Sequence, residues 1–195
     1  MKSKPILITA LCCSLIGVVY VSSGLYIQAK ALLAQYLLQD AWEQTLAGRA
    51  RVKPWSWADT WPVARLQYAK GKVDLIVLEG ASGSSLAFAP GHLQGTVKPG
   101  QAGYSVISAH RDTHFGFLKN IVKGDVLTLQ DPKGAGHEYE VITTEVVQSH
   151  QARLPTLKGN KGLMLVTCYP FNAVRAGGNL RYIVYAEEKP KDIDV

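Results

Sequence analysis

The chain has 195 residues, enough for one domain with a substantial hydrophobic core and an additional segment. Hydrophobic residues make up 47% of it and charged residues 18%, which excludes a disordered chain. The net charge is +6, but the basic residues are scattered and no helix-turn-helix, zinc-finger or RNA-binding pattern occurs, so we expect no nucleic acid partner. Three cysteines are too few for a disulfide framework.

An uncharged run from Pro5 to Ala29 follows Lys2 and Lys4. As a helix, this run is long enough to cross a hydrocarbon core of about 30 Å. The small residues Ser22 to Gly24 would also suit a cleaved signal peptide, but the run is longer than the usual apolar region of such a peptide. We therefore predict an uncleaved anchor over residues 1–29, with its N-terminus in the cytoplasm because the lysines lie mainly before the span.

A second segment, residues 30–61, is expected between the anchor and the folded domain. Apolar residues recur at helical spacing from Lys30 to Leu46, and Gly48 is a typical helix stop. A basic linker follows, and then three tryptophans that either pack on the domain or form an interfacial belt. These are Trp55, Trp57 and Trp61.

Beyond Pro62 the pattern changes to short β-rich runs separated by glycine and proline. Two of these runs flank the turn-rich stretch 131–136, which predicts a hairpin. The runs are Val63–Leu66, Val73–Leu78, Tyr104–Ala109, Val126–Gln130, Tyr139–Val147, Leu163–Thr167 and Leu180–Ala186. About seven or eight short strands without alternating helices indicate a mainly β fold, a closed or nearly closed barrel over residues 62–195.

The run from Leu163 to Thr167 ends at Cys168, the only cysteine outside the first fifteen residues. Tyr169 and Pro170 turn the chain away, which would leave the thiol at the tip of a buried strand. A lone cysteine in such a place is more often a small buried hydrophobe than a catalyst, so its interpretation depends on its partners.

Two other predicted strands have functional groups at their ends. His110 follows the run Tyr104–Ala109, and Arg181 begins the last run. His110 could favour the thiolate of Cys168 and protonate a leaving amine, and Arg181 could bind a carbonyl or an oxyanion. A structural histidine or a surface ion pair would explain either residue alone, but strand ends of a barrel can meet at one rim.

Three segments in this order resemble the catalytic elements of the sortases, the cysteine transpeptidases of bacterial surfaces. They are ISAHRDTHF with His110, LVTCYPF with Cys168 and LRYIVYAE with Arg181. The segment from Pro90 to Phe115 also resembles the family's approach to its catalytic histidine, and the resemblance covers residues 62–187. The TCYPF form and the single N-terminal anchor are most similar to the sortase class of Gram-negative bacteria.

The resemblance implies an eight-stranded sortase barrel that binds the LPXTG-like C-terminal sorting signal of a secreted protein. Cys168 would attack the threonine carbonyl and form a thioester, His110 would protonate the departing amine, and Arg181 would stabilise the oxyanion. Thr167 would add a donor near the oxyanion. An amine acceptor of the cell envelope would resolve the thioester, and the anchor would lie in the inner membrane with the barrel in the periplasm.

The resemblance also suggests that Asp112 and His114 orient His110 or line the substrate groove, with His92 as a further groove candidate. The HRDTH stretch lacks the glutamate of a helical zinc motif and follows a strand, and no acidic cluster suggests calcium. We therefore expect no metal and no cofactor. Arg111, between His110 and Asp112, could equally be a charged residue that faces solvent.

Two other functions stay open. An L,D-transpeptidase is also a cysteine acyl-transferase of the cell wall, but the histidine and glycine cluster that usually precedes its cysteine is replaced here by LMLVT. A non-catalytic, membrane-tethered barrel that binds a secreted partner is the second alternative.

Overall fold

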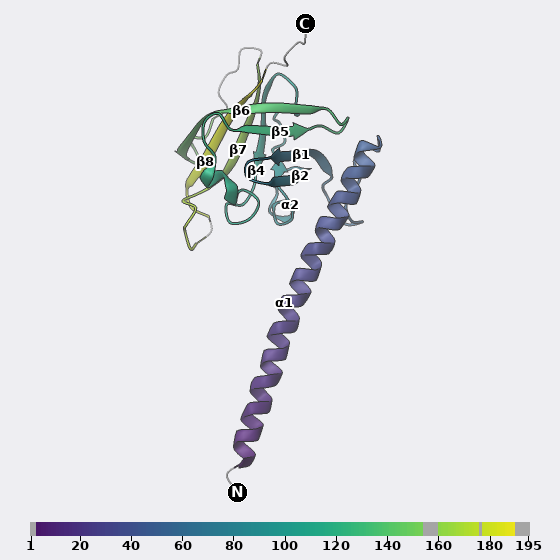
Figure 1. The fold of residues 1–195 in the computed structure, drawn as a ribbon, viewed down its shortest axis with the longest axis vertical. Helices are drawn as coiled ribbons and strands as arrows, with labels where there is room; N and C mark the ends of the chain where they lie inside the picture. Colours follow the sequence, from purple (N-terminus) through teal and green to yellow (C-terminus); the bar gives the residue numbers. More distant parts are fainter. Residues whose placement is uncertain (1–2, 154–159, 176, 190–195) are drawn as a thin grey trace. The chain divides into compact units, whose positions relative to one another are not determined.

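The computed structural model describes residues 3–153, 160–175 and 177–189. The chain divides into two compact units, Met1–Leu37 and Leu38–Val195. The first unit holds most of the long helix α1 (Ser3–Leu46), and the second holds the end of α1 and the strands (Figure 1). The predicted boundary at residues 29 and 30 falls inside this continuous helix, and the division into 1–29, 30–61 and 62–195 stays a prediction.

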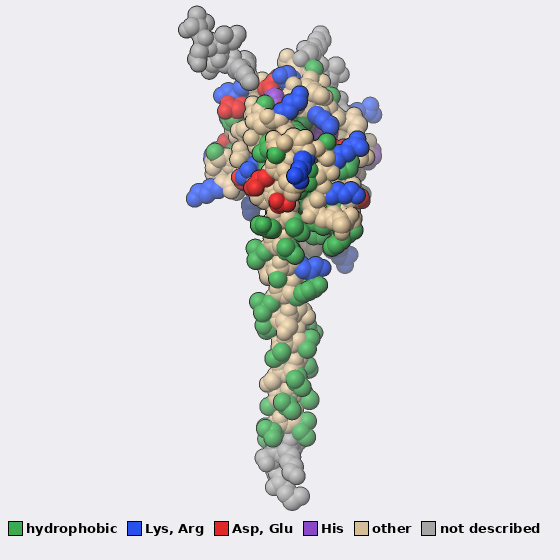
Figure 2. Space-filling model, turned by 90° about the vertical axis from the view of Figure 1, so that its right-hand side faces the viewer, with side chains coloured by type: hydrophobic (Ala, Val, Ile, Leu, Met, Phe, Trp, Pro, Cys, Tyr) green, Lys and Arg blue, Asp and Glu red, His purple; other side chains and the backbone are tan. Residues whose placement is uncertain are grey.

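Hydrophobic side chains lie all around α1 in the first unit, and Figure 2 shows them in green along the visible face of the helix. By length and composition this helix is able to cross a membrane. At its other end, Gly48 adopts a φ of 90° and its N–H donates to the carbonyl oxygen of Thr45 at 3.0 Å. The predicted helix stop at Gly48 is thus confirmed.

The second unit contains a closed eight-stranded barrel in the order β1-β2-β3-β4-β7-β8-β6-β5. The strands are β1 (Pro62–Tyr68), β2 (Val73–Glu79), β3 (Gly91–His92), β4 (Gly103–Ser108), β5 (Val126–Gln130), β6 (Gly136–Gln148), β7 (Lys161–Tyr169) and β8 (Leu180–Glu188). Two short helices, α2 (Gly83–Leu86) and η1 (Gly116–Asn120), lie in the connections. The predicted mainly β barrel is confirmed, and each of the seven predicted runs overlaps a strand.

The eighth strand, β3, has no signal in the sequence because it consists of two residues after a proline. It pairs parallel with β2 and antiparallel with β4. The backbone of Gly91 lies so close to that of Gly80 that a Cβ atom would collide with the Gly80 carbonyl oxygen. In the sequence Gly91 is typical of a turn. In the structure a glycine is required at this position because two chain segments approach each other closely.

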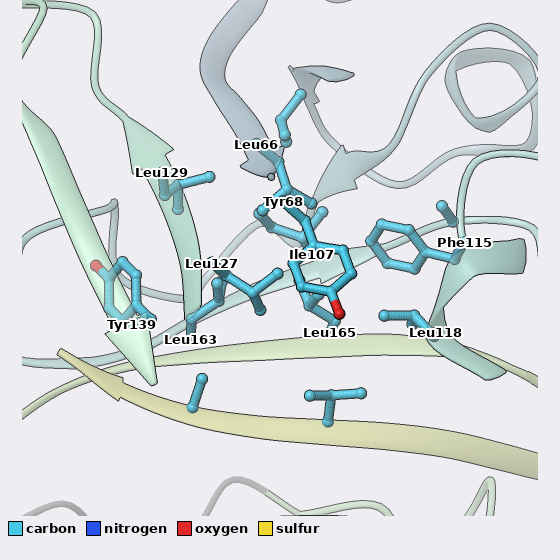
Figure 3. Packing of buried hydrophobic residues seen from close by; sticks show 14 of the residues in the cluster. Leu66, Tyr68, Ile107, Phe115, Leu118, Leu127, Leu129, Tyr139, Leu163 and Leu165 are labelled. Atoms are coloured by element: carbon cyan, nitrogen blue, oxygen red, sulfur yellow. The ribbon is translucent and has the colours of Figure 1, made fainter. Parts of the chain in front are cut away.

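Leucine and aromatic side chains fill the barrel (Figure 3). Two of them, Phe115 and Leu118, come from the connection after β4 and are fully buried. The others labelled in the figure are Leu66, Tyr68, Ile107, Leu127, Leu129, Tyr139, Leu163 and Leu165. Because the connection after β4 contributes to the core, it is fixed to the barrel like a strand.

Asp125, just before β5, is a buried carboxylate that joins two chain segments, the end of β1 with the turn after it and the connection before β5. It accepts hydrogen bonds from the Tyr68 hydroxyl at 2.7 Å, Lys70 Nζ at 2.8 Å and the Val122 N–H at 2.9 Å. Burial alone would raise the pKa of Asp125, but these hydrogen bonds outweigh it and hold the pKa below its ordinary value. Burial and the contact with Asp125 raise the pKa of Tyr68 to about 12.

Replacing Asp125 by asparagine should lower the free energy of unfolding by about 1–3 kcal/mol at neutral pH, because Tyr68 and Lys70 lose a charged acceptor. The folded-state pKa of Asp125 is depressed, so its contribution is present above the unfolded value of about 3.9 and is lost as the pH falls through the folded value. Urea unfolding of the full chain in detergent, followed by tryptophan fluorescence, measures both effects.

The matched control for this prediction is Asp59→Asn, since Asp59 is exposed. It should change the unfolding free energy by no more than about 0.5 kcal/mol. Equal unfolding free energies for the two asparagine variants would contradict the role given to Asp125.

Candidate active site

Cys168 lies near the end of β7, the strand between β4 and β8. β4 runs parallel to β7, with Ser108 opposite Val166, and His110 follows two residues later. β8 runs antiparallel to β7 and places Arg181 directly opposite Cys168. The three residues predicted as catalytic therefore lie at the same end of the barrel, on adjoining strand ends.

Thr167 fixes the junction between β4 and β7. Its side chain is buried, and its hydroxyl donates to the carbonyl oxygen of Ala109 at 2.7 Å. The N–H of Ala109 in turn donates to the carbonyl oxygen of Val166 at 3.2 Å, which extends the ladder beyond the end of β4. The hydroxyl is thus bonded inside the protein, where it supports the residue before His110, and a hydroxyl or backbone donor of Thr167 near the oxyanion stays a prediction.

The three side chains differ in accessibility: His110 is exposed, whereas Cys168 and Arg181 are half-buried, and Cys168 is a free thiol. Nη1 of Arg181 donates to the carbonyl oxygens of Gly178 at 2.6 Å and Leu180 at 2.9 Å. Among the described residues none accepts from its Nε or Nη2. Arg181 is thus oriented by its own loop and keeps donors for another acceptor.

The two predicted partners of His110 are placed differently. His114 is half-buried, and its burial together with the charge of His110 lowers the pKa of His114 below its ordinary value. This imidazole is therefore neutral at neutral pH and electrostatically coupled to His110. Asp112 is exposed, and its carboxylate contacts Nε of Arg111 at 3.3 Å.

His92, the further groove candidate, is a nearly enclosed side chain. Its exposed fraction is 3%, and its Nε2 lies 3.0 Å from the carbonyl oxygen of Val97 and 3.3 Å from the hydroxyl of Thr96. Its Nδ1 faces the Glu79 carboxylate at 4.0 Å. The ring is thus almost fully enclosed, and the role of His92 as a groove residue stays a prediction.

Arg111 is the residue whose importance the sequence does not reveal. Its side chain is 3% exposed, and its Nη2 donates to the carbonyl oxygens of Ala173 at 2.9 Å and Arg175 at 2.8 Å. These carbonyls belong to the loop that follows Cys168. The only sequence feature that could have indicated its burial is its position next to His110. Neighbouring side chains at a strand end point to opposite sides, so an exposed His110 implies an inward-pointing Arg111.

Three aromatic rings, those of Tyr169, Phe171 and Tyr182, pack together beside Cys168. Their centroids lie 5.2 to 6.3 Å apart, and Phe171 and Tyr182 also contact the main core. The Tyr169–Pro170 peptide bond is cis. The start of the loop after Cys168 is therefore held by apolar contacts as well as by Arg111.

Within the described ranges, no group of three or more histidine, cysteine or acidic side chains could hold a metal ion. A cavity of about 440 Å³ lies between the start of β1, the end of β2 and the β5–β6 turn. These elements are at the opposite end of the barrel from Cys168. The chemistry predicted for Cys168 would therefore take place at the strand ends and not in this cavity.

Residues 66–189 match the family model of the sortase domain. The chain belongs to the sortase family. Among its relatives is Sortase D of Bacillus subtilis (strain 168), with 35% identity over 125 residues. That match covers 63% of this chain and 61% of the relative, so this sortase spans less than two thirds of the relative's length.

The barrel of this sortase is similar to that of solved structures. Sortase C-1 from Actinomyces oris has 28% identity and a TM-score of 0.59, with 66% of this chain and 75% of that chain covered. Sortase A from Corynebacterium diphtheriae has a TM-score of 0.63 over 83% and 86% of the two chains, and its 20% identity shows the fold alone. The comparisons support the family and the fold, but they do not support the Gram-negative class indicated by the sequence.

The coupling between the two histidines gives a prediction. In an NMR titration of the full chain, His114 should titrate below the ordinary histidine value of about 6.5. In the His110→Gln protein the midpoint of His114 should rise, because the charge of His110 is removed, but it should stay below the ordinary value because burial remains. His150→Gln, a change of an exposed histidine, is the control and should leave the midpoint unchanged. If the titration midpoint of His114 is the same in the wild-type and His110→Gln proteins, the two rings are not neighbours.

Proposed function

We propose that this sortase is a membrane-anchored cysteine transpeptidase that cleaves an LPXTG-like C-terminal sorting signal of a secreted protein and transfers the product to an amine acceptor. The observation that supports this most directly is the register of β7, which sets Arg181 opposite Cys168 and brings His110 to the adjoining strand end. A nucleophile, a proton donor and a permanent cation at one rim are what acyl transfer through a thiol requires.

In the first half of the reaction, the thiolate of Cys168 attacks the threonine carbonyl carbon of the signal. A C–S bond forms and the carbonyl oxygen takes up the negative charge. Arg181 donates to this oxyanion from Nε or Nη2, while Nη1 keeps its bonds to the loop carbonyls. His110 then gives a proton to the departing amine as the C–N bond breaks, which leaves a thioester on Cys168.

In the second half, an amine acceptor of the cell envelope attacks the thioester carbonyl. His110 accepts the proton of the attacking amine, the C–S bond breaks, and the sulfur of Cys168 leaves as a thiolate. Water in place of the amine would give hydrolysis. The exposed ring of His110 is accessible to either acceptor.

The proposal includes the membrane arrangement. Residues 1–29 form a single-pass anchor in the inner membrane, residues 30–61 connect it to the barrel, and residues 62–195 act in the periplasm. Lys2 and Lys4 before the span favour this orientation. The TCYPF form and the single anchor are the sequence features that favour the class of Gram-negative bacteria.

The test uses the full chain in detergent micelles with an LPXTG-type peptide and an amine acceptor. Intact mass should show a thioester on the wild-type protein and none on Cys168→Ala. Arg181→Ala should lower the rate of thioester formation by about 10²-fold or more, because the oxyanion loses its charged donor. Arg49→Ala, a change of an exposed arginine beside the cavity at the opposite end of the barrel, is the control and should keep the wild-type rate.

Two outcomes would count against the proposal. Peptide binding without a thioester on the wild-type protein would favour a non-catalytic barrel that holds a secreted partner. A thioester on the Cys168→Ala protein would exclude Cys168 as the nucleophile.

A further inference from the structure

The loop between β7 and β8 passes the candidate active site, and two arginines bind its carbonyl oxygens. Arg111 binds the first half of the loop, at Ala173 and Arg175. Arg181 binds the second half, at Gly178 and Leu180. The first arginine stands outside the loop in sequence, directly after His110, so it connects two separate segments of the site.

The contact made by Arg111 is a fixed one. Its side chain is 3% exposed, and its Nη1 is buried with no hydrogen-bond partner among the described residues. The acidic neighbour Asp112 is 63% exposed, and its Oδ1 lies 3.3 Å from Nε of Arg111, so this contact is the more exposed one. A guanidinium keeps its charge in any surroundings, so a buried one depends on the acceptors it has. For Arg111 these acceptors are chiefly the carbonyl oxygens of Ala173 and Arg175. If the loop moved away, the buried guanidinium would lose both hydrogen bonds.

The segment that begins with His110 is also fixed on its other side. The N–H of Phe115 donates to the carbonyl oxygen of His110 at 3.0 Å, and the Phe115 ring is fully buried in the barrel core. His110 thus stands at the head of a short turn that is anchored by Phe115 in the core and by Arg111 in the neighbouring loop. Only the exposed imidazole has freedom to move.

We propose that Arg111 is a positioning residue of the active site. It ties the first half of the β7–β8 loop to the segment of His110 and so keeps His110 aligned with Cys168. The second half of the loop, which begins at Gly177 with a φ of 83°, stays free to follow Arg181 when a substrate binds. The catalytic part of this inference rests on the proposed function.

Trypsin offers a direct test of the tether, since it cleaves the peptide bond after Arg175, whose carbonyl oxygen Arg111 binds. In the full chain in detergent, Arg111→Met should raise the rate of cleavage after Arg175 about tenfold or more relative to cleavage after Arg153, measured by mass spectrometry. The rate of thioester formation at saturating peptide should fall by about 10- to 100-fold, as expected for a misplaced catalytic group. The peptide concentration at half-saturation should change by less than about threefold.

Rescue and control variants separate positioning from general destabilisation. Arg111→Lys keeps a buried cation with several donors and should hold both rates within about fivefold of the wild-type protein. Arg49→Met removes an exposed arginine at the opposite end of the barrel and should leave cleavage after Arg175, relative to cleavage after Arg153, and thioester formation unchanged. If Arg111→Met does not melt cooperatively, Arg111→Gln takes its place, because its shorter amide cannot span both carbonyls.

Each result decides the inference. Wild-type protection of Arg175 in the methionine variant would overturn the tether, and faster cleavage with an unchanged rate of thioester formation would overturn the positioning role. A wild-type protein that forms no thioester would instead refute the proposed function and the catalytic part of the inference with it. The cleavage measurement needs no substrate, so the tether itself would still be decided.

Discussion

The double pairing of β7 is the constraint on which the site depends. This strand is bonded to β4 along one edge and to β8 along the other, in registers that leave little freedom at its end. The parallel neighbour brings His110 and the antiparallel neighbour brings Arg181, so two distant parts of the sequence reach Cys168 through backbone hydrogen bonds. A slip of one residue in either ladder would turn the neighbouring side chain to the other face of the barrel.

Paired charges complement the apolar core near the ends of the strands. Asp125 joins the end of β1 to the connection before β5. At the far end of β8, Glu188 accepts from His137 at 2.8 Å and pairs with Lys161 at 3.0 Å. Burial alone would raise the pKa of Glu188, but these two partners outweigh it and lower the pKa. The apolar core thus fills the barrel, and paired charges connect neighbouring segments near the strand ends.

The sequence predicts the parts of this sortase that follow a local pattern. β-branched and apolar runs gave seven strands, and strand ends pointed to Cys168, His110 and Arg181, which the structure brings to one rim. The features that the sequence does not predict depend on contacts between distant parts of the chain. β3 depends on the approach of Gly91 to Gly80, which no pattern encodes. From its residue type alone, Arg111 would be predicted to lie on the surface. It is buried because the loop after Cys168 folds over it.

The pairing of β7, which includes β4 only as far as Val166, has a consequence for how a peptide could be selected. Many proteins capture extended peptides by strand addition, in which main-chain hydrogen bonds supply much of the affinity. That mode is closed along β7 from Gly162 to Val166, because β4 occupies one edge and β8 the other. At Cys168 the β4 ladder has ended and β8 alone pairs with the strand, so a peptide bound as proposed would lie across the strand ends and contact the side chains of the rim. Selectivity would then reside in a few exposed connections, and exchanging them would change which peptides are bound while the barrel stays as it is.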